Sequence, residues 1–265
     1  MKADYTLKKS LGQHFLVHEE TCRNIVDALG SYSGPLLEIG PGAGALTKYL
    51  IQNPQWDLHC IELDREKVQY LLKHYPALQS RITEADFLKM ECPFPGTFRI
   101  IGNFPYNISS QILFRVLDWR DQVEAVVGMF QKEVAVRITS KHGNKDYGIL
   151  SVLIQTYYET EYLFDVPAAR FQPPPKVESG VLLMKRKWKD PEGLDYNRFR
   201  QFVKTAFNQR RKTLRNGFRS WLKPDQLKES IFDKRAEQLS INEFVQLFQS
   251  LYPPGEDFSN TTFTE

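Results

Sequence analysis

The segment best suited to chemistry is Asn103-Phe104-Pro105-Tyr106, which directly follows a short apolar run. An adenine amine is a poor nucleophile, because its nitrogen lone pair is delocalised into the ring. The Asn103 oxygen and a backbone carbonyl before Pro105 can accept both amine hydrogens, since proline holds the preceding residue extended. Tyr106 offers a face on which a flipped-out base can stack. The segment therefore predicts methyl transfer to an adenine amine, achieved by in-line positioning without a general base.

A glycine-rich segment nearer the N-terminus predicts a cofactor site. Residues 35–39 are typical of a buried strand, and Gly40-Pro41-Gly42-Ala43-Gly44 follows directly, before a helical pattern. Glycines let the backbone approach a ligand, and a helix N-terminus favours negative groups. Glu62 ends the next apolar run, where a carboxylate can accept hydrogen bonds from both hydroxyls of a ribose. The same spacing satisfies a dinucleotide fingerprint with Ala45 in the last position, so the loop alone does not identify the cofactor.

Three features favour S-adenosylmethionine over a dinucleotide. Glu38 stands just before the loop, where it would repel a pyrophosphate but not a zwitterionic methionine group. Asp86 follows the third expected strand, where a carboxylate can accept from an adenine amine. The segment 103–106 follows the fourth and suits a methyl acceptor. A nicotinamide dehydrogenase is the alternative enzyme class, but no proton donor is apparent beside a hydride acceptor.

The elements that must position these residues alternate between strand and helix as far as about residue 185. The expected strands cover residues 35–39, 56–62, 81–83, 98–101, 125–130, 150–157 and 180–185. Helical patterns lie between them, as in a parallel α/β sheet. After residue 193 only helical patterns remain, at 197–207, 212–222, 225–230 and 241–251. We therefore expect a catalytic domain over residues 1–189 and a small helical domain over residues 190–265.

The composition is that of an ordinary globular protein. The 265 residues are 42% hydrophobic and 25% charged, which excludes disordered, collagen-like and coiled-coil chains. No apolar run approaches 18 residues and the N-terminus has no secretory pattern, so we expect a cytoplasmic protein without a membrane partner. Cys22, Cys60 and Cys92 are far apart, which argues against a disulfide framework and a zinc ribbon, and no metal is expected.

One strongly basic stretch stands out against a net charge of only +3. Residues 198–219 include eight lysines and arginines and no acidic residue. Such a stretch predicts contact with a polyanion, through phosphates rather than bases. The alternative is a solvated helix face opposite an apolar one. The predicted RNA-binding residues are Arg198, Lys204, Arg210, Arg211, Lys212 and Arg215.

An ordered series of motifs resembles the KsgA/RsmA-type small-subunit (16S) rRNA adenine N6,N6-dimethyltransferases, over about residues 8 to 220. The motifs are Gly12-Gln13-His14-Phe15-Leu16, Glu38-Ile39-Gly40-Pro41-Gly42, Ile61-Glu62-Leu63-Asp64, Ala85-Asp86, Asn103-Phe104-Pro105-Tyr106-Asn107-Ile108-Ser109, Gln131-Lys132-Glu133-Val134, Tyr147-Gly148-Ile149-Leu150-Ser151 and Phe171-Gln172-Pro173-Pro174-Pro175-Lys176-Val177. Each motif is weak alone, but their order along one chain is specific.

The resemblance implies a Rossmann-like S-adenosylmethionine-dependent methyltransferase fold, with a mixed seven-stranded sheet and a small C-terminal all-α domain. It implies dimethylation of N6 on two adjacent adenosines in the 3′-terminal hairpin of small-subunit rRNA, during late biogenesis of the 30S subunit. The expected partner is that rRNA within a partly assembled 30S subunit, and a monomer is the default state.

The resemblance also implies roles for individual residues. The cofactor-binding residues would be His14, Leu16, Gly40, Glu62, Asp86 and Asn103. The catalytic residues would be Asn103, Phe104, Pro105, Tyr106 and Phe171, with Tyr106 and Phe171 on the two faces of the target adenine. Two positions depart from the family pattern: His14 replaces the more usual Asn, and Phe104 replaces the usual Leu.

Structural alternatives exist for several of these residues. Glu38 could cap amides of its own loop, His14 could be a structural histidine, and Phe171 could fill the core under a rigid proline loop. At the level of function, the alternatives are an Erm-type large-subunit rRNA dimethylase and a non-catalytic assembly factor of the same fold. The triple proline favours the small-subunit type, and the intact residues 103–106 argue against lost activity.

Overall fold

The computed structural model describes residues 14–253, which form two compact units. The first unit contains the chain up to Val136 together with Glu159–Arg186. The second contains Arg137–Tyr158 together with the chain from Lys187 onward. None of the helices in the described residues has the length and apolar character needed to cross a membrane.

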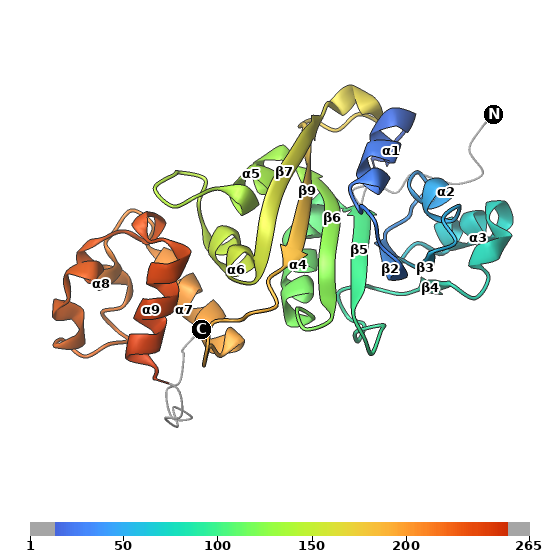
Figure 1. Cartoon of the computed structure of the whole chain (residues 1–265). Helices are drawn as coiled ribbons and strands as arrows, with labels where there is room; N and C mark the ends of the chain where they lie inside the picture. The colour runs from blue at the N-terminus through green and yellow to red at the C-terminus, as the bar shows by residue number, and fades with distance from the viewer. Residues whose placement is uncertain (1–13, 254–265) are drawn as a thin grey trace. The chain divides into compact units, whose positions relative to one another are not determined.

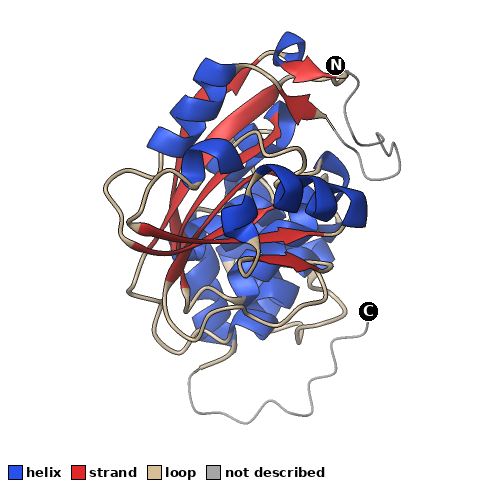
Figure 2. Cartoon of the chain, turned by 90° about the vertical axis from the view of Figure 1, so that its right-hand side faces the viewer, coloured by secondary structure: helices blue, strands red, loops and turns tan. Residues whose placement is uncertain are grey.

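The first unit is built on a seven-stranded sheet, in which β2, β3 and β5 lie side by side (Figure 1). The strands are, in spatial order, β4 (Ile82–Glu84), β3 (Trp56–Glu62), β2 (Gly34–Ile39), β5 (Phe98–Asn103), β6 (Val123–Gln131), β9 (Ser179–Arg186) and β7 (Tyr158–Val166). The pairs from β4 to β6 are parallel, whereas β6 and β9 are antiparallel. The expectation of a mixed seven-stranded sheet is confirmed. Seen from the side, the strands fan out at an angle to one another, which is the usual twist (Figure 2).

Apolar sequence explains why this sheet is central to the unit. The strands β2 and β6 are nearly continuous apolar runs, and Leu36, Leu37, Val127 and Met129 are fully buried. Parallel strands covered on both faces have this composition rather than strict alternation. The helices that follow the strands are α2 (Thr47–Leu50), α3 (Arg65–His74), α4 (Ser109–Asp118) and α5 (Lys132–Thr139), and α1 (Glu19–Asp27) precedes β2.

A helix cap fixes the end of β3. The Asp64 side chain accepts a hydrogen bond from the Glu66 backbone N–H, so α3 begins at Arg65. A capping aspartate satisfies an amide that the helix leaves unpaired. The chain therefore turns directly after Glu62, and that carboxylate stands at the carboxyl edge of the sheet.

The second unit is helical and has an aromatic core. Its helices are α6 (Ile149–Tyr157), α7 (Tyr196–Asn208), α8 (Leu214–Gly217) and α9 (Ile241–Leu251), and α6 packs against α7 and α9. Phe202 stacks on Phe218 with ring centroids 4.7 Å apart, and both rings are fully buried, as are those of Phe199 and Phe244. The expected C-terminal helical region is present.

Three predicted elements differ from the structure. Residues 150–157, expected as a strand, form α6, and the strand β7 begins immediately after it. This segment is apolar on nearly every side because α6 is buried all round, and a short apolar run has no period that separates helix from strand. The helix expected over 212–222 is only the four residues of α8, and the one expected over 225–230 contains a 3-10 turn at Gln226–Lys228.

The division into compact units also differs from the boundary expected after residue 189. Residues 137–158 group with the C-terminal helices rather than with the sheet. The cause is that α6 packs against α7 and α9. The expected boundary at residue 189 had placed α6 in one domain and these two helices in the other. The functional division into residues 1–189 and 190–265 stays a prediction.

Candidate active site

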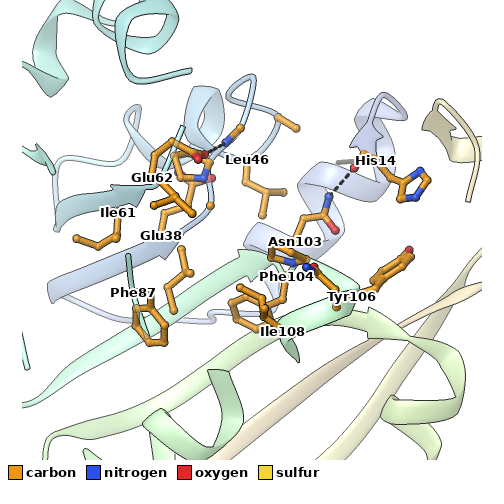
Figure 3. Close-up of a pocket in the computed structure, with 18 of the residues that line it drawn as sticks. His14, Glu38, Leu46, Ile61, Glu62, Phe87, Asn103, Phe104, Tyr106 and Ile108 are labelled. Atoms are coloured by element: carbon orange, nitrogen blue, oxygen red, sulfur yellow. Dashed lines mark hydrogen bonds between the residues drawn. The ribbon is translucent and has the colours of Figure 1, made fainter. Parts of the chain in front are cut away.

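A cavity of about 230 Å³ lies at the carboxyl ends of β2, β3 and β5 (Figure 3). Ligands of open α/β sheets bind at this edge, outside the ends of the strands. The cavity wall contains every residue predicted to bind the cofactor, namely His14, Leu16, Gly40, Glu62, Asp86 and Asn103. It also contains Phe104, Pro105 and Tyr106. Residues from five separate segments thus meet around one space.

The glycine loop needs its glycines for backbone reasons. Gly40 and Gly42 have φ angles of 65° and 57°, a region that residues with a Cβ atom rarely adopt. A Cβ atom on Gly42 would also lie 3.1 Å from the Phe15 ring. The Gly40 N–H donates to the Ile61 carbonyl over 2.9 Å, which fixes the loop against the end of β3. The loop is therefore preformed at the cavity wall.

Glu62 ties the glycine loop to the start of α3. Its two carboxylate oxygens accept hydrogen bonds from the backbone N–H groups of Gly42, over 3.0 Å, and Asp64, over 2.9 Å. Burial raises the pKa of this carboxyl, and the two amide donors oppose the rise. Each carboxylate oxygen can accept a second hydrogen bond. Glu62 can therefore hold the loop and still accept from the hydroxyls of a ligand.

Glu38 lines the cavity, and its side chain also bonds within the protein. It is 1% exposed at the cavity wall, and one of its oxygens accepts from the Thr47 hydroxyl over 2.7 Å. The Cys60 thiol lies 3.7 Å from the same oxygen. Burial raises the pKa of Glu38 to about 7, against the lowering effect of these donors. A carboxyl with this pKa carries a fractional charge near neutral pH.

Glu38→Gln is expected to increase the free energy of unfolding at pH 8 by about 1–3 kcal/mol. Because the pKa rises from 4.5 to about 7 on folding, the stabilising protonation is complete below pH 4.5 and is lost as the pH rises through 7. The gain should therefore shrink toward pH 5. Thermal unfolding of both proteins between pH 5 and 8 measures it, with the exposed Glu161→Gln as the control. A difference that does not change with pH would contradict the assignment.

One of the two carboxylate oxygens of Asp86 bonds to the backbone of its own loop. One carboxylate oxygen accepts from the Leu88 N–H over 3.0 Å, and the Lys89 ammonium lies 3.5 Å from the other. The side chain is partly exposed at the cavity. The carboxylate oxygen beside the exposed Lys89 can accept a hydrogen bond from an amine in the cavity.

The amide of Asn103 has a fixed orientation. Its Nδ2 donates to the backbone carbonyl of His14 over 3.1 Å, as Figure 3 shows. The hydrogen-bond network decides which end of an asparagine amide is the oxygen. With the nitrogen committed to His14, the oxygen points the other way and remains an acceptor. The acceptor at His14 is a backbone atom, so replacement of the family's usual Asn by His leaves this contact intact.

The Phe104 side chain packs against two glycines of the sheet, Gly102 and Gly128. Its ring is buried and packs on Phe130, with centroids 5.0 Å apart. A Cβ atom on Gly102 or Gly128 would lie 2.6 or 2.4 Å from the Phe104 ring. The larger side chain that replaces the usual leucine therefore fills space that these two glycines leave in the sheet.

The Tyr106 hydroxyl is hydrogen-bonded to Ser179, and the His14 ring lies against one face of the Tyr106 ring. Its hydroxyl lies 2.5 Å from the Ser179 Oγ, and the His14 ring lies nearly parallel to it at 5.8 Å. Burial raises the pKa of Tyr106, so the phenol stays protonated at neutral pH. Sequence reasoning missed Ser179, because a residue 73 positions away gives no spacing signal.

Phe171 lies in the core and is absent from the described residues that line the cavity. It begins β8 (Phe171–Gln172), which pairs with β1 (Phe15–Leu16), and it stands opposite Leu16. Its side chain is 4% exposed. The register of this short pairing turns the ring into the core, as the structural alternative for Phe171 expected. Stacking on a base would require the ring to leave that position, and it stays a prediction.

The cavity wall also contains apolar residues that were not among the predicted site residues. These residues are Phe15, Ile39, Pro41, Ala45, Leu46, Ile61, Leu63, Ala85, Phe87, Leu88 and Ile108. Several are direct neighbours of predicted residues, which is the only signal that could have found them. Leu63 is 54% exposed beside Glu62, an uncommon exposure for a large apolar side chain at a cavity. The first two residues of the motif at 12–16 lie outside the described residues.

The predicted RNA-binding residues of the second unit fall into two groups. Arg215 pairs with Asp233 over 2.6 Å, and Arg210 donates to the Tyr147 carbonyl over 3.2 Å and to the Lys145 carbonyl. Lys204, Arg211 and Lys212 are exposed, and Arg198 is partly buried. Asp233 lies outside the acid-free residues 198–219, so the sequence of that stretch gave no sign of the pairing.

Within residues 14–253, no three His, Cys, Asp or Glu side chains gather closely enough to hold a metal ion.

Comparison with curated proteins gives close relatives over nearly the whole chain. A Cytophaga hutchinsonii protein named ribosomal RNA small subunit methyltransferase A is 50% identical over 250 residues, which are 92% of this chain and 96% of the relative. The protein of the same name from Flavobacterium johnsoniae is 52% identical over 254 residues, which are 94% and 97% of the two chains.

Solved structures agree on the fold. A dimethyladenosine transferase from Plasmodium falciparum superposes with a TM-score of 0.76 at 25% identity, over 90% of this chain and 97% of that chain. The 23S rRNA methyltransferase ErmE superposes with a TM-score of 0.67 at 23% identity, over 88% and 98%, and shares the fold. Residues 5–252 match the family model described as ribosomal RNA adenine dimethylase. The resemblance seen in the motifs is confirmed: the chain belongs to the ribosomal RNA adenine dimethylase family.

Proposed function

We propose that this chain transfers methyl groups from S-adenosylmethionine to N6 of two adjacent adenosines in the 3′-terminal hairpin of small-subunit rRNA. The observation that carries the proposal is the Asn103 amide, whose nitrogen is committed to the His14 carbonyl and whose oxygen is left as an acceptor beside the cavity. The relatives named small subunit methyltransferase A support the choice of substrate over that of the large-subunit enzymes.

The residues around the cavity fit S-adenosylmethionine. Glu62 retains acceptor capacity for the ribose hydroxyls, and Asp86 can accept from the adenine amine. The exposed apolar side chain of Leu63 can cover a face of the adenine. Glu38, His14, Leu16 and Gly40 also line the cavity, and we assign them to the methionine group. The bound cofactor supplies an electrophilic methyl group on a sulfonium.

The protein's part in the reaction is alignment. The Asn103 oxygen and the backbone carbonyl of Phe104 accept the two hydrogens of the target amine, which localises its lone pair. Tyr106 stacks on the base and sets the plane in which the amine lies. The amine proton becomes acidic once the methyl group has been transferred, so water can remove it without a general base. Alignment of the reacting atoms carries most of the rate enhancement.

We infer that Lys204, Arg211 and Lys212 contact rRNA phosphates, while Arg210 and Arg215, which bond within the unit, stabilise the fold around them. Lys204, Arg211 and Lys212 are exposed, whereas Arg215 is bound to Asp233. Residues 190–265 would then act as the RNA-contacting part and residues 1–189 as the catalytic part. We further propose that the protein works as a cytoplasmic monomer on a partly assembled 30S subunit.

Replacing Lys204, Arg211 and Lys212 together by glutamine is expected to weaken RNA binding and to reduce its dependence on salt. Each lost phosphate contact lowers the slope of log K against log salt by about 1, so a change of up to about 3 is expected. Filter binding at several salt concentrations measures the slope. An unchanged slope would contradict phosphate contact, and an unchanged Kd for S-adenosylmethionine serves as the control.

Parallel methylation assays with different RNA substrates test the proposed target. The protein is incubated with labelled S-adenosylmethionine and with small subunits, large subunits or naked rRNA, each unmethylated. Label on small subunits alone supports the proposal. Label on large subunits alone would assign the chain to the Erm-type enzymes. Cofactor binding without label on any substrate would leave the non-catalytic assembly factor as the remaining interpretation.

A further inference from the structure

The hydroxyl of Tyr106 is bonded to a residue that no part of the proposed reaction uses. It lies 2.5 Å from the Oγ of Ser179, and either hydroxyl can donate. Tyr106 follows β5, whereas Ser179 is the first residue of β9. Ser179 is 0% exposed, and a buried hydroxyl of this kind bonds within the protein. A residue of the sheet thus holds the far end of the Tyr106 side chain.

Ser179 is itself fixed by the residues before it. It stands opposite Gln131 in the antiparallel pairing of β6 and β9. The backbone N–H of Lys132 donates to the Glu178 carbonyl over 2.9 Å. The Lys132 ammonium bonds the Glu178 carboxylate over 2.9 Å and Asp165 of β7 over 2.8 Å. The residue preceding Ser179 is therefore held both by its backbone and by its side chain.

The residue after Ser179 is covered by an aromatic ring. A Cβ atom on Gly180 would lie 2.5 Å from the Tyr162 hydroxyl, so the phenol of Tyr162 packs directly on the backbone there. The Tyr162 hydroxyl also donates to Asp165, which closes the network back to Lys132. Ser179 consequently has little freedom to move along or across the sheet.

A second contact restricts the ring of Tyr106 from one face. The His14 imidazole lies nearly parallel to it, at an interplanar angle of 26°, and His14 Nδ1 lies 2.9 Å from the Pro173 carbonyl. Figure 3 shows both rings at the same end of the cavity, next to Asn103. Tyr106 is therefore fixed at its hydroxyl and bounded on one face, close to the amide that would accept the target amine.

We propose that Ser179 is a positioning residue of the methyl-transfer site, which acts by holding the phenol of Tyr106. The inference rests on the proposed function, in which the target adenine stacks on this ring. The sheet, through Ser179, sets the plane of the ring, and the ring sets the plane of the base relative to Asn103. Small losses of alignment reduce rates strongly when catalysis depends on positioning.

A double-mutant cycle between Ser179→Ala and Tyr106→Phe tests this tether. Each variant removes one hydroxyl and keeps the aromatic ring, so each is expected to lower kcat about tenfold. The double variant should be no slower than either single variant, because one hydrogen bond has been lost in all three. The Kd for S-adenosylmethionine should stay within about twofold. Losses that multiply, or an unchanged kcat in Ser179→Ala, would overturn the proposal.

Thr156→Val provides the matched control, since it removes another buried hydroxyl, whose bond to the Val152 carbonyl lies within α6. Its kcat should equal that of the wild type. Proteins labelled with 3-fluorotyrosine supply a readout that does not depend on activity, with the Tyr106 resonance assigned from Tyr106→Phe. Ser179→Ala should shift or broaden that ¹⁹F resonance, and Thr156→Val should not.

The two kinds of failure are distinguishable. An unaltered Tyr106 resonance in Ser179→Ala contradicts the tether whether or not the wild type is active. Absence of methyl transfer by the wild type, with the resonance altered as expected, contradicts the proposed function and leaves the tether supported.

Discussion

Asn103→Ala is expected to reduce the rate of methyl transfer about a hundred- to a thousandfold, with a much smaller effect on the Kd for S-adenosylmethionine. The variant removes the acceptor that we assign to the target amine, and loss of one such preorganised group commonly costs this much. It also removes the donor to the His14 carbonyl, so His14 loses one of its contacts. Single-turnover kinetics with labelled cofactor measures the rate, and calorimetry measures the Kd.

The control for Asn103→Ala is Asn24→Ala, which alters an exposed asparagine of α1 and should leave the rate unchanged. A rate within about threefold of the wild type in Asn103→Ala would contradict the assigned role. A large increase in the cofactor Kd with a normal rate at saturation would instead make Asn103 a binding residue alone.

Glu62→Ala is expected to weaken cofactor binding at least about a hundredfold. Hydrogen bonds to a charged group contribute about 1.5–3 kcal/mol each, and a pair of them corresponds to a hundredfold or more. The variant also leaves the amides of Gly42 and Asp64 without their acceptor, so the glycine loop loses its attachment to α3. A lower Tm is expected along with the higher Kd.

Glu62→Gln separates the two effects of Glu62→Ala. Glutamine keeps one acceptor oxygen and the shape of the side chain, so Tm should recover more than affinity does. Calorimetric titration with S-adenosylmethionine and thermal unfolding provide both quantities. A Kd within about threefold of the wild type in Glu62→Ala would contradict the ribose-binding assignment.

The parts of the fold that could be predicted were those with a clear local pattern. The strand β3 has the expected bounds, because its apolar run ends at Glu62 and a capping aspartate begins the next helix. The segment 150–157 was misassigned because burial on all sides removes the period on which the prediction depends. The strand that follows it, β7, lies at the end of the strand order beyond β9, and its weak alternation gave little signal.

The site shows the same division between local and long-range information. The position of Gly40, Glu62, Asp86 and Asn103 at the cavity was expected because each ends or follows a strand whose carboxyl end lies at one edge of the sheet, whereas His14 and Leu16 were expected only from the resemblance. The surroundings of Phe171 could not, because a two-residue pairing with β1 decides which way its ring points. Pairs distant in sequence, such as Arg215 with Asp233 and Tyr106 with Ser179, form only through tertiary structure.

We propose that this chain dimethylates adenine in small-subunit rRNA through Asn103. The most direct test is mass spectrometry of nucleosides from unmethylated small subunits after incubation with S-adenosylmethionine and either wild-type protein or Asn103→Ala. We expect N6,N6-dimethyladenosine from the wild type, at two residues per subunit, and almost none from the variant. Equal amounts from both proteins would contradict the role of Asn103, and a methylated nucleoside other than an N6-methylated adenosine would contradict the proposed reaction.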